Sequence, residues 1–143
     1  MPQQLYVVIV GCGRLGSHLA DRLSRDGHSV VAIDVEERAL AGLSHEYGGF
    51  RIHGDATELG VLRQAKTERA DAVFATTGED NVNLMVAQVA RTVLGVPRVV
   101  ARVSNPRREE TYRRMGIETV CPTSIAAELL LRWLADRKGE VGR

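Results

Sequence analysis

Short, largely apolar runs alternate with helical segments along the chain, and this alternation limits the possible folds more than any other feature. Six runs are read as strands, and the first two have the character of strands that are buried on both faces of a sheet. They are residues 5–10, 29–34, 50–53, 72–75, 98–103 and 119–121. After the first run, Leu15, Leu19 and Leu23 recur at helical spacing. Parallel strands joined by right-handed crossovers carry helices on both faces. The sequence therefore predicts an α/β fold: a doubly wound, Rossmann-like sheet of about six parallel strands.

The helices are expected to fill the intervals between these strands. We expect them at residues 14–26, 36–47, 59–65, 81–94, after Pro106, and at 124–138. A chain of 143 residues suits one hydrophobic core. We therefore expect a single domain over residues 1–138 and a flexible tail over residues 139–143.

Charge and hydropathy exclude several classes of protein. Nineteen Lys and Arg against eighteen Asp and Glu leave a net charge of +1, which creates no field that would attract nucleic acid. The first apolar run is too short for a signal sequence or a membrane span. Cys12 and Cys121 have neither CxxC spacing nor neighbouring histidines. We expect a cytoplasmic protein with reduced cysteines, no metal site and no nucleic-acid partner.

The strongest chemical motif is Gly11-Cys12-Gly13-Arg14-Leu15-Gly16, which follows the first strand and opens the first helix. In such a GxGxxG loop the first glycine permits the tight turn, the second lets the backbone approach a pyrophosphate, and the third allows close packing of helix and strand. The helix N-terminus offers unbonded N–H groups to the anion. A strand-to-helix turn without a ligand is the alternative. We interpret Cys12 as a small residue between two glycines rather than as a reactive thiol.

Asp34 ends the second strand 18 residues after Gly16, where a carboxylate accepts hydrogen bonds from the hydroxyls of an adenosine ribose. It would repel a 2′-phosphate, and the next arginine is Arg38, so NAD or an adenine nucleotide with an unphosphorylated ribose is favoured over NADP. Val35, which follows Asp34, is included in the predicted site. Alternatively, Asp34 caps the following helix.

Arg14 distinguishes this loop from those of most dehydrogenases, where small or apolar residues are common. A guanidinium can clasp the oxygens of a terminal or bridging phosphate. Alternatively, Arg14 faces solvent in the first helical turn, although a cation there opposes the helix dipole.

Ligands of a doubly wound sheet bind beyond the carboxyl ends of the strands, and further candidates collect along that rim. They are Asp55, Ala56, Thr76, Thr77, Gly78 and Arg102. Alternatively, Asp55 and Thr57 cap the third helix, and residues 76–78 form a simple turn.

Taken together, these residues resemble the RCK, or KTN, nucleotide-binding domains of the TrkA-N type, which regulate potassium channels and transporters. The resemblance spans nearly the whole chain. It rests on VVIVGCGRLGSHLA, the strand-end Asp34, HGDATELGVL, ATTGEDNVNLMVAQVAR and VVARVSNP. Arg14 and residues 54–57 separate the sequence from generic dehydrogenases.

The resemblance implies a role for each part of the rim. Residues 11–16 would hold phosphates, and Asp34 would hold the ribose. Residues 55–56 would surround the adenine, and residues 76–78 would lie at the inner edge of the ligand. Arg102 would reach the phosphates or a partner subunit. The implied ligand is NAD(H), ATP, ADP or AMP.

The resemblance also implies a partner, a membrane potassium channel or transporter subunit at the inner face of the plasma membrane. Two features depart from the family. Members often carry a glutamate after the proline that precedes the final helix, where it contributes to a cation site, whereas Thr123 and Ser124 follow Pro122 here. Divalent-metal binding is therefore not expected. The usual second, C-terminal regulatory module does not fit within these residues.

The final predicted helix is apolar around most of its circumference. Its large apolar residues include Ile125, Leu129, Leu130, Trp133 and Leu134. One sheet face cannot bury all of them, so we expect a homodimer or a higher ring. In the resembled family, the corresponding helix crosses over to the neighbouring subunit. Packing entirely within its own domain is the alternative.

The predicted function is a cytoplasmic nucleotide-sensing subunit or domain that controls potassium transport without turning the nucleotide over. One alternative is a nucleotide-dependent interaction module with another partner. The other is a small NAD-dependent oxidoreductase, which would need a proton-transfer group and a substrate pocket. The sequence has no Tyr-xxx-Lys pair and no histidine in a recognisable catalytic context. We therefore predict that the protein is not an enzyme.

Overall fold

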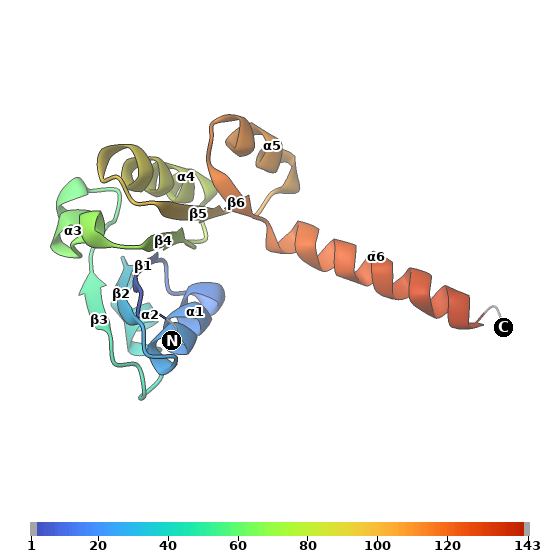
Figure 1. Ribbon diagram of the computed structural model, residues 1–143, viewed down its shortest axis with the longest axis horizontal. Coiled ribbons are helices and arrows are strands. Elements are labelled where there is room, and N and C mark those ends of the chain that lie inside the picture. The colour runs from blue at the N-terminus through green and yellow to red at the C-terminus, as the bar shows by residue number, and fades with distance from the viewer. Residues whose placement is uncertain (1–2, 142–143) are drawn as a thin grey trace.

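The computed structural model describes residues 3–141 and forms an α/β body from which one long helix extends (Figure 1). The strands are β1 (Tyr6–Val10), β2 (Ser29–Asp34), β3 (Phe50–His53), β4 (Ala72–Ala75), β5 (Arg98–Arg102) and β6 (Glu118–Val120). The helices are α1 (Arg14–Arg25), α2 (Glu37–Ala41), α3 (Leu59–Gln64), α4 (Asp80–Gln88), α5 (Pro106–Arg114) and α6 (Pro122–Val141). A 3-10 turn, η1 (Thr67–Arg69), follows α3, and a π-helical turn, η2 (Val89–Val93), continues α4.

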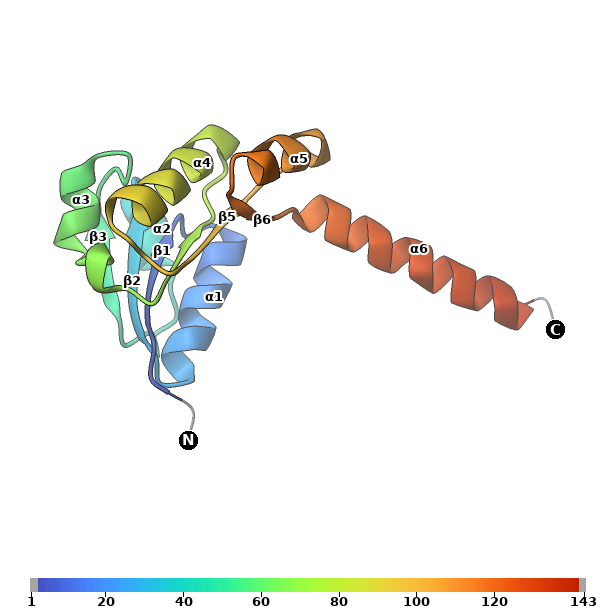
Figure 2. The same ribbon diagram turned by 45° about the horizontal axis from the view of Figure 1, so that its top comes forward.

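The six strands form one parallel sheet in the order β3-β2-β1-β4-β5-β6. The chain winds outward from β1 to β3 and then returns to the other side of β1 with β4. The predicted doubly wound, Rossmann-like sheet is confirmed, and its switch point lies between β1 and β4. Figure 2 shows helices on both sides of this sheet.

Alternate side chains of the central strands pack into two hydrophobic layers, one on each face of the sheet. On one face, Val8 and Val31 are buried with residues of α3 and α4. On the other face, Val7 and Val30 are buried with residues of α1 and α2. A strand covered on both faces needs apolar residues at every position, which explains the unbroken apolar runs of β1 and β2.

The expected helix over residues 36–47 is wrong in its length, because α2 ends at Ala41. Leu43 and Tyr47 follow the helical period and are buried, but a turn rather than a helix brings them to the core. The backbone N–H of Ser44 donates to Asp21 Oδ1 (3.0 Å), and the Tyr47 hydroxyl donates to the carbonyl of Phe50 (2.8 Å). These bonds replace the helical ones that the period alone had suggested.

The last helix, α6, leaves the body after Pro122 and points away from the sheet in both views (Figures 1 and 2). It begins two residues before the expected start, because proline is well suited to the first position of a helix. It also includes residues 139–141, the first three residues of the segment expected as a tail; residues 142–143 lie outside the described residues.

The apolar side chains of α6 do not pack within their own domain, so that alternative is wrong. On the part of α6 whose side chains are described, the large apolar residues that are more than half exposed are Leu129, Leu130, Leu131, Trp133 and Leu134. Leu130 is the most exposed of them, at 67%. Across the described residues, none of the helices combines the length and apolar character that a membrane crossing requires.

Candidate functional site

A cleft of about 740 Å³ opens at the carboxyl ends of the central strands, beside the switch point of the sheet. Twelve of the fourteen residues predicted as a ligand site line it. They are Gly11, Gly13, Arg14, Leu15, Asp34, Val35, Asp55, Ala56, Thr76, Thr77, Gly78 and Arg102. Cys12 and Gly16 do not line the cleft, because the thiol packs in the core and Gly16 packs against the loop.

The three motif glycines have different environments. Gly11 has a φ of +95°, and a Cβ added there would lie 2.5 Å from the amide nitrogen of Thr77. A Cβ on Gly16 would lie 1.8 Å from the carbonyl oxygen of Gly11. By contrast, nothing lies within 4 Å of a Cβ added to Gly13. Gly11 and Gly16 are therefore required by the fold itself, whereas Gly13 leaves open space above the loop.

Helix α1 begins directly at this open space. Gly13 is its N-cap residue and supplies no side-chain hydrogen bond to the first turn, which contains no acidic residue. The first N–H groups and the positive end of the helix dipole thus face the cleft with no acidic side chain in the first helical turn. Arg14 adds an exposed guanidinium at the same place. This end of the cleft is suited to an anion.

The Cys12 thiol lies below the loop rather than in the cleft. Cys12 is only 3% exposed and packs within the layer that contains α1 and α2. Burial, together with the nearby Asp34 carboxylate, raises the pKa of the Cys12 thiol to about 12. Because the thiolate is the reactive form, the interpretation of Cys12 as a small packing residue fits this environment.

Asp34 joins the glycine loop to the end of β2. Its Oδ2 accepts a hydrogen bond from the backbone N–H of Cys12 (2.7 Å), and its Oδ1 accepts one from Glu36 (2.8 Å). Asp34 is not the helix cap, because Glu36 is the N-cap residue of α2. Each carboxylate oxygen has a further lone pair, so the group can still accept a hydrogen bond from the cleft.

Asp55 organises the turn between β3 and α3. Its Oδ1 accepts hydrogen bonds from the Thr57 backbone N–H (2.9 Å) and hydroxyl (2.7 Å). These bonds stabilise the ionised form and hold the pKa of the Asp55 carboxyl below its ordinary value. The N-cap residue of α3 is Glu58, so neither Asp55 nor Thr57 occupies the cap position. The turn presents Ala56 to the cleft, where its side chain is buried.

The turn after β4 is braced from three sides. The Thr76 hydroxyl donates to the carbonyl of Gly11 (2.8 Å), which links the turn to the glycine loop. The amide of Asn83, which is 0% exposed, accepts from the Thr77 backbone N–H (2.9 Å) and donates to its carbonyl (3.0 Å). Arg102 also donates to the Thr77 carbonyl (3.1 Å). Residues 76–78 therefore form a turn, which was the alternative expected from the sequence. Hydrogen bonds from Thr76, Asn83 and Arg102 hold this turn beside the cleft.

Several residues of the site were missed by sequence reasoning. The cleft is also lined by Glu36, Glu79, Val82 and Pro122. Asn83 does not line the cleft, but its amide accepts a hydrogen bond from the backbone N–H of Thr77, which does. The available signal was the asparagine itself, since Asn83 lies in a helix at a position that the apolar period assigns to the core. A buried amide in such a place needs partners, and here they are the cleft turn and the carbonyl of Arg102.

The cleft is lined by charged side chains of both signs. Arg14 lies at the helix end and Arg102 beside the braced turn, whereas Asp34 and Glu36 lie at the end of β2 and Asp55 and Glu79 lie on the turns after β3 and β4. In the part of the chain that the structure describes, there is no cluster of three or more His, Cys, Asp or Glu residues suited to a metal ion. The arrangement fits a molecule that is anionic at one end and carries hydroxyl groups at the other.

A doubly wound parallel sheet with a glycine-rich turn and a strand-end carboxylate at its switch point defines the class of Rossmann-fold ligand-binding domains. Within this class the similarities are specific. The chain belongs to the TrkA-N domain family, whose family model matches residues 7–123.

Sequence comparison with individual proteins also finds Trk potassium uptake proteins. Over 130 residues the chain is 42% identical to the Trk system potassium uptake protein TrkA of Streptomyces coelicolor. The alignment covers 91% of this chain and 58% of that relative, so the chain spans little more than half of its length.

Two solved structures are similar in fold. The GsuK channel bound to NAD superposes with a TM-score of 0.80 at 27% identity, over 96% of this chain and 24% of that one. The TrkA-N domain of the inner membrane protein ybaL from Escherichia coli has a TM-score of 0.80 at 21% identity, over 94% of this chain and 99% of that one. The second similarity concerns the fold alone.

Proposed function

We propose that this domain binds NAD(H) or an adenine nucleotide in the cleft and senses it without turnover, as part of a protein that controls potassium transport. The observation that carries the proposal is the contrast between the glycines: Gly11 and Gly16 are packed tightly, whereas Gly13 leaves open space over the end of α1. The space over Gly13 and the first N–H groups of α1 together offer room and donors to a phosphate.

In this proposal the phosphates lie over the glycine loop, where Arg14 and the first turn of α1 neutralise them. The ribose hydroxyls donate to Asp34, whose position is already set by the backbone of Cys12 and Glu36. Glu36 adds a second negative charge at this end of the cleft and disfavours a 2′-phosphate. We therefore expect NAD(H) to bind more tightly than NADP(H).

Residues 55–56 would then border the adenine, and residues 76–78 would border the inner edge of the ligand. Arg102 is half-buried and already donates to the Thr77 carbonyl, so it can add its remaining donors to a phosphate without losing its place. Similarity to the GsuK channel bound to NAD supports this class of ligand.

Potassium transport is proposed on the strength of the family and its named relatives. Membership in the TrkA-N family and 42% identity to a Trk potassium uptake protein favour a membrane potassium transporter or channel subunit as the partner. The domain would then work at the inner face of the membrane. Co-purification with such a subunit should depend on whether nucleotide is bound; failure to co-purify in every nucleotide state would contradict this part.

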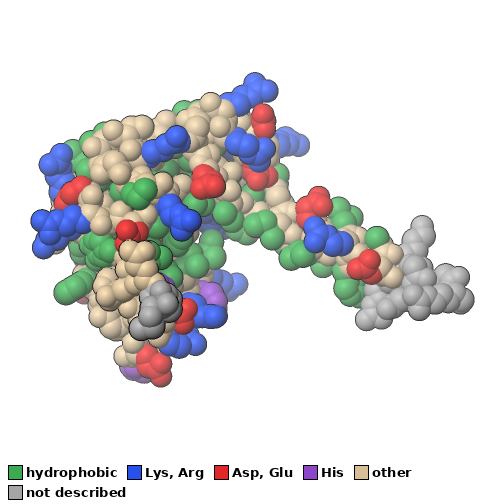
Figure 3. Space-filling model, viewed as in Figure 1, with side chains coloured by type: hydrophobic (Ala, Val, Ile, Leu, Met, Phe, Trp, Pro, Cys, Tyr) green, Lys and Arg blue, Asp and Glu red, His purple; other side chains and the backbone are tan. Residues whose placement is uncertain are grey.

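The exposed helix α6 supports assembly with a second copy of the chain. Figure 3 shows hydrophobic side chains beside a row of charged ones along this helix, well away from the sheet. Large apolar side chains exposed in such number are commonly covered by a partner, and a two-fold homodimer is the commonest arrangement. We propose that α6 packs against a second subunit in a dimer or larger ring.

Binding measurements on two variants test the ligand site. Asp34→Ala and Arg14→Ala should each weaken nucleotide binding by roughly tenfold or more in calorimetry, as expected when one charge-assisted hydrogen bond is lost. Arg14→Ala should affect ATP more than AMP, because the guanidinium addresses the distal phosphates. Asp34→Ala should affect every adenosine ligand alike.

Arg25→Ala is the matched control, because Arg25 is an exposed arginine at the other end of the same helix and does not line the cleft. Its nucleotide affinity should equal that of the wild type. Unchanged affinity in both Asp34→Ala and Arg14→Ala would refute the assigned site.

A further inference from the structure

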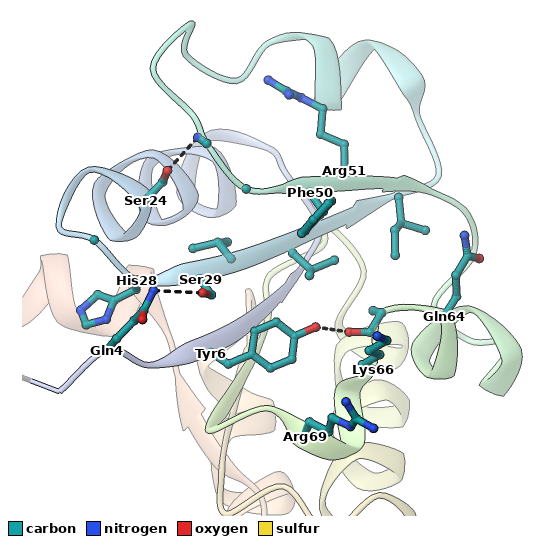
Figure 4. Close-up of a pocket in the computed structure, with 17 residues that line it drawn as sticks. Gln4, Tyr6, Ser24, His28, Ser29, Phe50, Arg51, Gln64, Lys66 and Arg69 are labelled. Carbon is teal, nitrogen blue, oxygen red and sulfur yellow. Dashed lines mark hydrogen bonds between the residues drawn. The ribbon is translucent and has the colours of Figure 1, made fainter.

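A second groove lies at the opposite edge of the sheet, at the amino-terminal ends of β1, β2 and β3 (Figure 4). Its volume is about 890 Å³, within the range of sites for small molecules. No residue lines both this amino-terminal groove and the cleft described above. The two are therefore separate sites on one sheet.

One side of the amino-terminal groove is apolar. Phe50 pairs with Val31 in the sheet register, and Ile52 follows on the same face. Helix α3 has only six residues, and Phe50 remains 76% exposed although it begins a strand. Tyr6 also borders the groove, and its hydroxyl donates to the carbonyl of Ala65 (Figure 4). Aromatic and branched side chains thus offer flat contact surface to a ligand.

The other side of the groove is cationic. Lys66 precedes the η1 turn as its N-cap residue and Arg69 ends the turn, and both residues line the groove. Within the described residues, neither side chain forms an ion pair. None of the residues that line the groove is acidic. Lys66 and Arg69 are therefore the cations that line this side of the groove, whereas the neighbouring Glu68 carboxylate does not line it. Burial, and after it the Glu68 carboxylate, raises the pKa of the Tyr6 hydroxyl.

Arg51 also lines the groove but does not add its charge to this side. Its guanidinium points away from the groove in Figure 4, and its Nε donates to the carbonyl of Leu40 (3.0 Å). The same group stacks over the Tyr47 ring at 5.0 Å from the ring centre. The positive charge available to a ligand therefore comes from Lys66 and Arg69.

The backbone places Lys66 at the rim in an unusual way. Among the described residues, it is the only non-glycine with a positive φ, at 54°. It follows the C-cap of α3, where glycine is the usual residue. Its N–H donates to the carbonyl of Arg63 and its carbonyl accepts from Arg69, both at 2.9 Å. The left-handed residue thus ends α3 and starts the turn that carries Arg69.

We propose that the amino-terminal groove is a second ligand site, which binds an organic anion with a flat apolar body. The charged group lies between Lys66 and Arg69, and the apolar body lies against Phe50 and Val31. Charge complementarity and the one-sided distribution of aromatic surface carry this inference, which does not depend on nucleotide binding in the other cleft.

A fluorescent aromatic sulfonate, 1-anilinonaphthalene-8-sulfonate, provides the probe. Titrated into the full chain, it should shift the backbone amide resonances of residues 48–50 and 64–69 saturably, because these segments border the groove. The double variant Lys66→Gly with Arg69→Gln should bind it roughly tenfold more weakly or worse, since two charge-assisted contacts are removed. Phe50→Ser should also weaken binding, because the flat contact surface is lost.

The variants are chosen so that folding does not obscure the result. Glycine at position 66 accepts the positive φ without strain, and Phe50 is largely exposed. Arg63→Gln is the matched control, since Arg63 is an exposed cation of α3 that does not line the groove. Its affinity for the sulfonate should stay within about twofold of the wild type.

A neutral analogue of the probe, N-phenyl-1-naphthylamine, separates charge recognition from simple hydrophobic adsorption. It should bind the wild type at least tenfold more weakly than the sulfonate, in keeping with loss of a charge-assisted contact. Equal affinity for the neutral analogue would overturn the proposal. So would resonance shifts confined to residues 11–16 or to α6, or a double variant that binds the sulfonate as tightly as the wild type.

Discussion

Replacing Gly16 by alanine should destabilise the fold, and the structure gives the expected size of the effect. A Cβ at this position lies 1.8 Å from the carbonyl oxygen of Gly11, which is 1.6 Å closer than the 3.4 Å at which ordinary contact begins. The obstructing atom is backbone, so the loop or the helix must move. Such overpacking lowers the free energy of unfolding by about 3 kcal/mol, whereas the better helix propensity of alanine raises it by about 1 kcal/mol.

The net loss is therefore about 2 kcal/mol or more in the free energy of unfolding. For a chain of this size, this corresponds to a Tm lower by roughly 4–8 °C. Urea denaturation and thermal unfolding, both followed by far-ultraviolet circular dichroism, measure the two quantities.

Gly13→Ala is the matched control within the same loop. No atom lies within 4 Å of its added Cβ, and its φ of −73° is ordinary for any residue. Its stability should stay within about 1 kcal/mol of the wild type, because alanine is only a weaker N-cap than glycine. If phosphates approach the open space above Gly13, its nucleotide affinity should nevertheless fall by about tenfold or more. Wild-type stability for Gly16→Ala, or equal destabilisation of both variants, would refute this division of roles.

Three further predictions concern residues around the cleft. Asn83→Ala should lower the free energy of unfolding by about 2–4 kcal/mol in urea denaturation, because removing the fully buried amide leaves the backbone groups of Thr77 and Arg102 without their hydrogen-bond partner. An Asn83→Ala variant of wild-type stability would contradict this. The Cys12 thiol, with a pKa of about 12, should react with Ellman's reagent at neutral pH far more slowly than an unfolded control; reaction at the unfolded rate would show that it is accessible. In NMR the Asp55 carboxyl should titrate below its ordinary pKa, and Thr57→Val should raise the pKa of Asp55. The stabilisation linked to Asp55 is present above the pKa of the unfolded state and is lost as the pH falls through the pKa of the folded state. A titration midpoint of Asp55 at its ordinary value would contradict this prediction.

The strands and the parallel, doubly wound sheet could be predicted because burial on both faces of the central strands leaves a strong sequence signal. Val7 and Val8 point to opposite layers, so neither position tolerates a polar residue, and the run stands out. The glycine loop was equally visible, since its spacing and its place after a strand have a mechanical cause.

The extents of helices were less predictable, because the apolar period does not distinguish a helix from a compact turn. Leu43 and Tyr47 keep the period after α2 has ended, and side-chain hydrogen bonds hold them instead. The brace formed by Asn83 and the amino-terminal groove at Phe50 depend on contacts between residues far apart in the sequence. No local pattern encodes such contacts.

The central claim is that the cleft over the glycine loop takes a nucleotide, and mapping the bound ligand by NMR tests it most directly. Nucleotide-stripped protein is titrated with NADH and separately with ADP while the backbone amide resonances are followed. The account predicts saturable shifts for Gly13, for residues 34–36 and for residues 76–78, which border the cleft from three sides. Absence of shifts at millimolar ligand, or shifts confined to other segments, would contradict it.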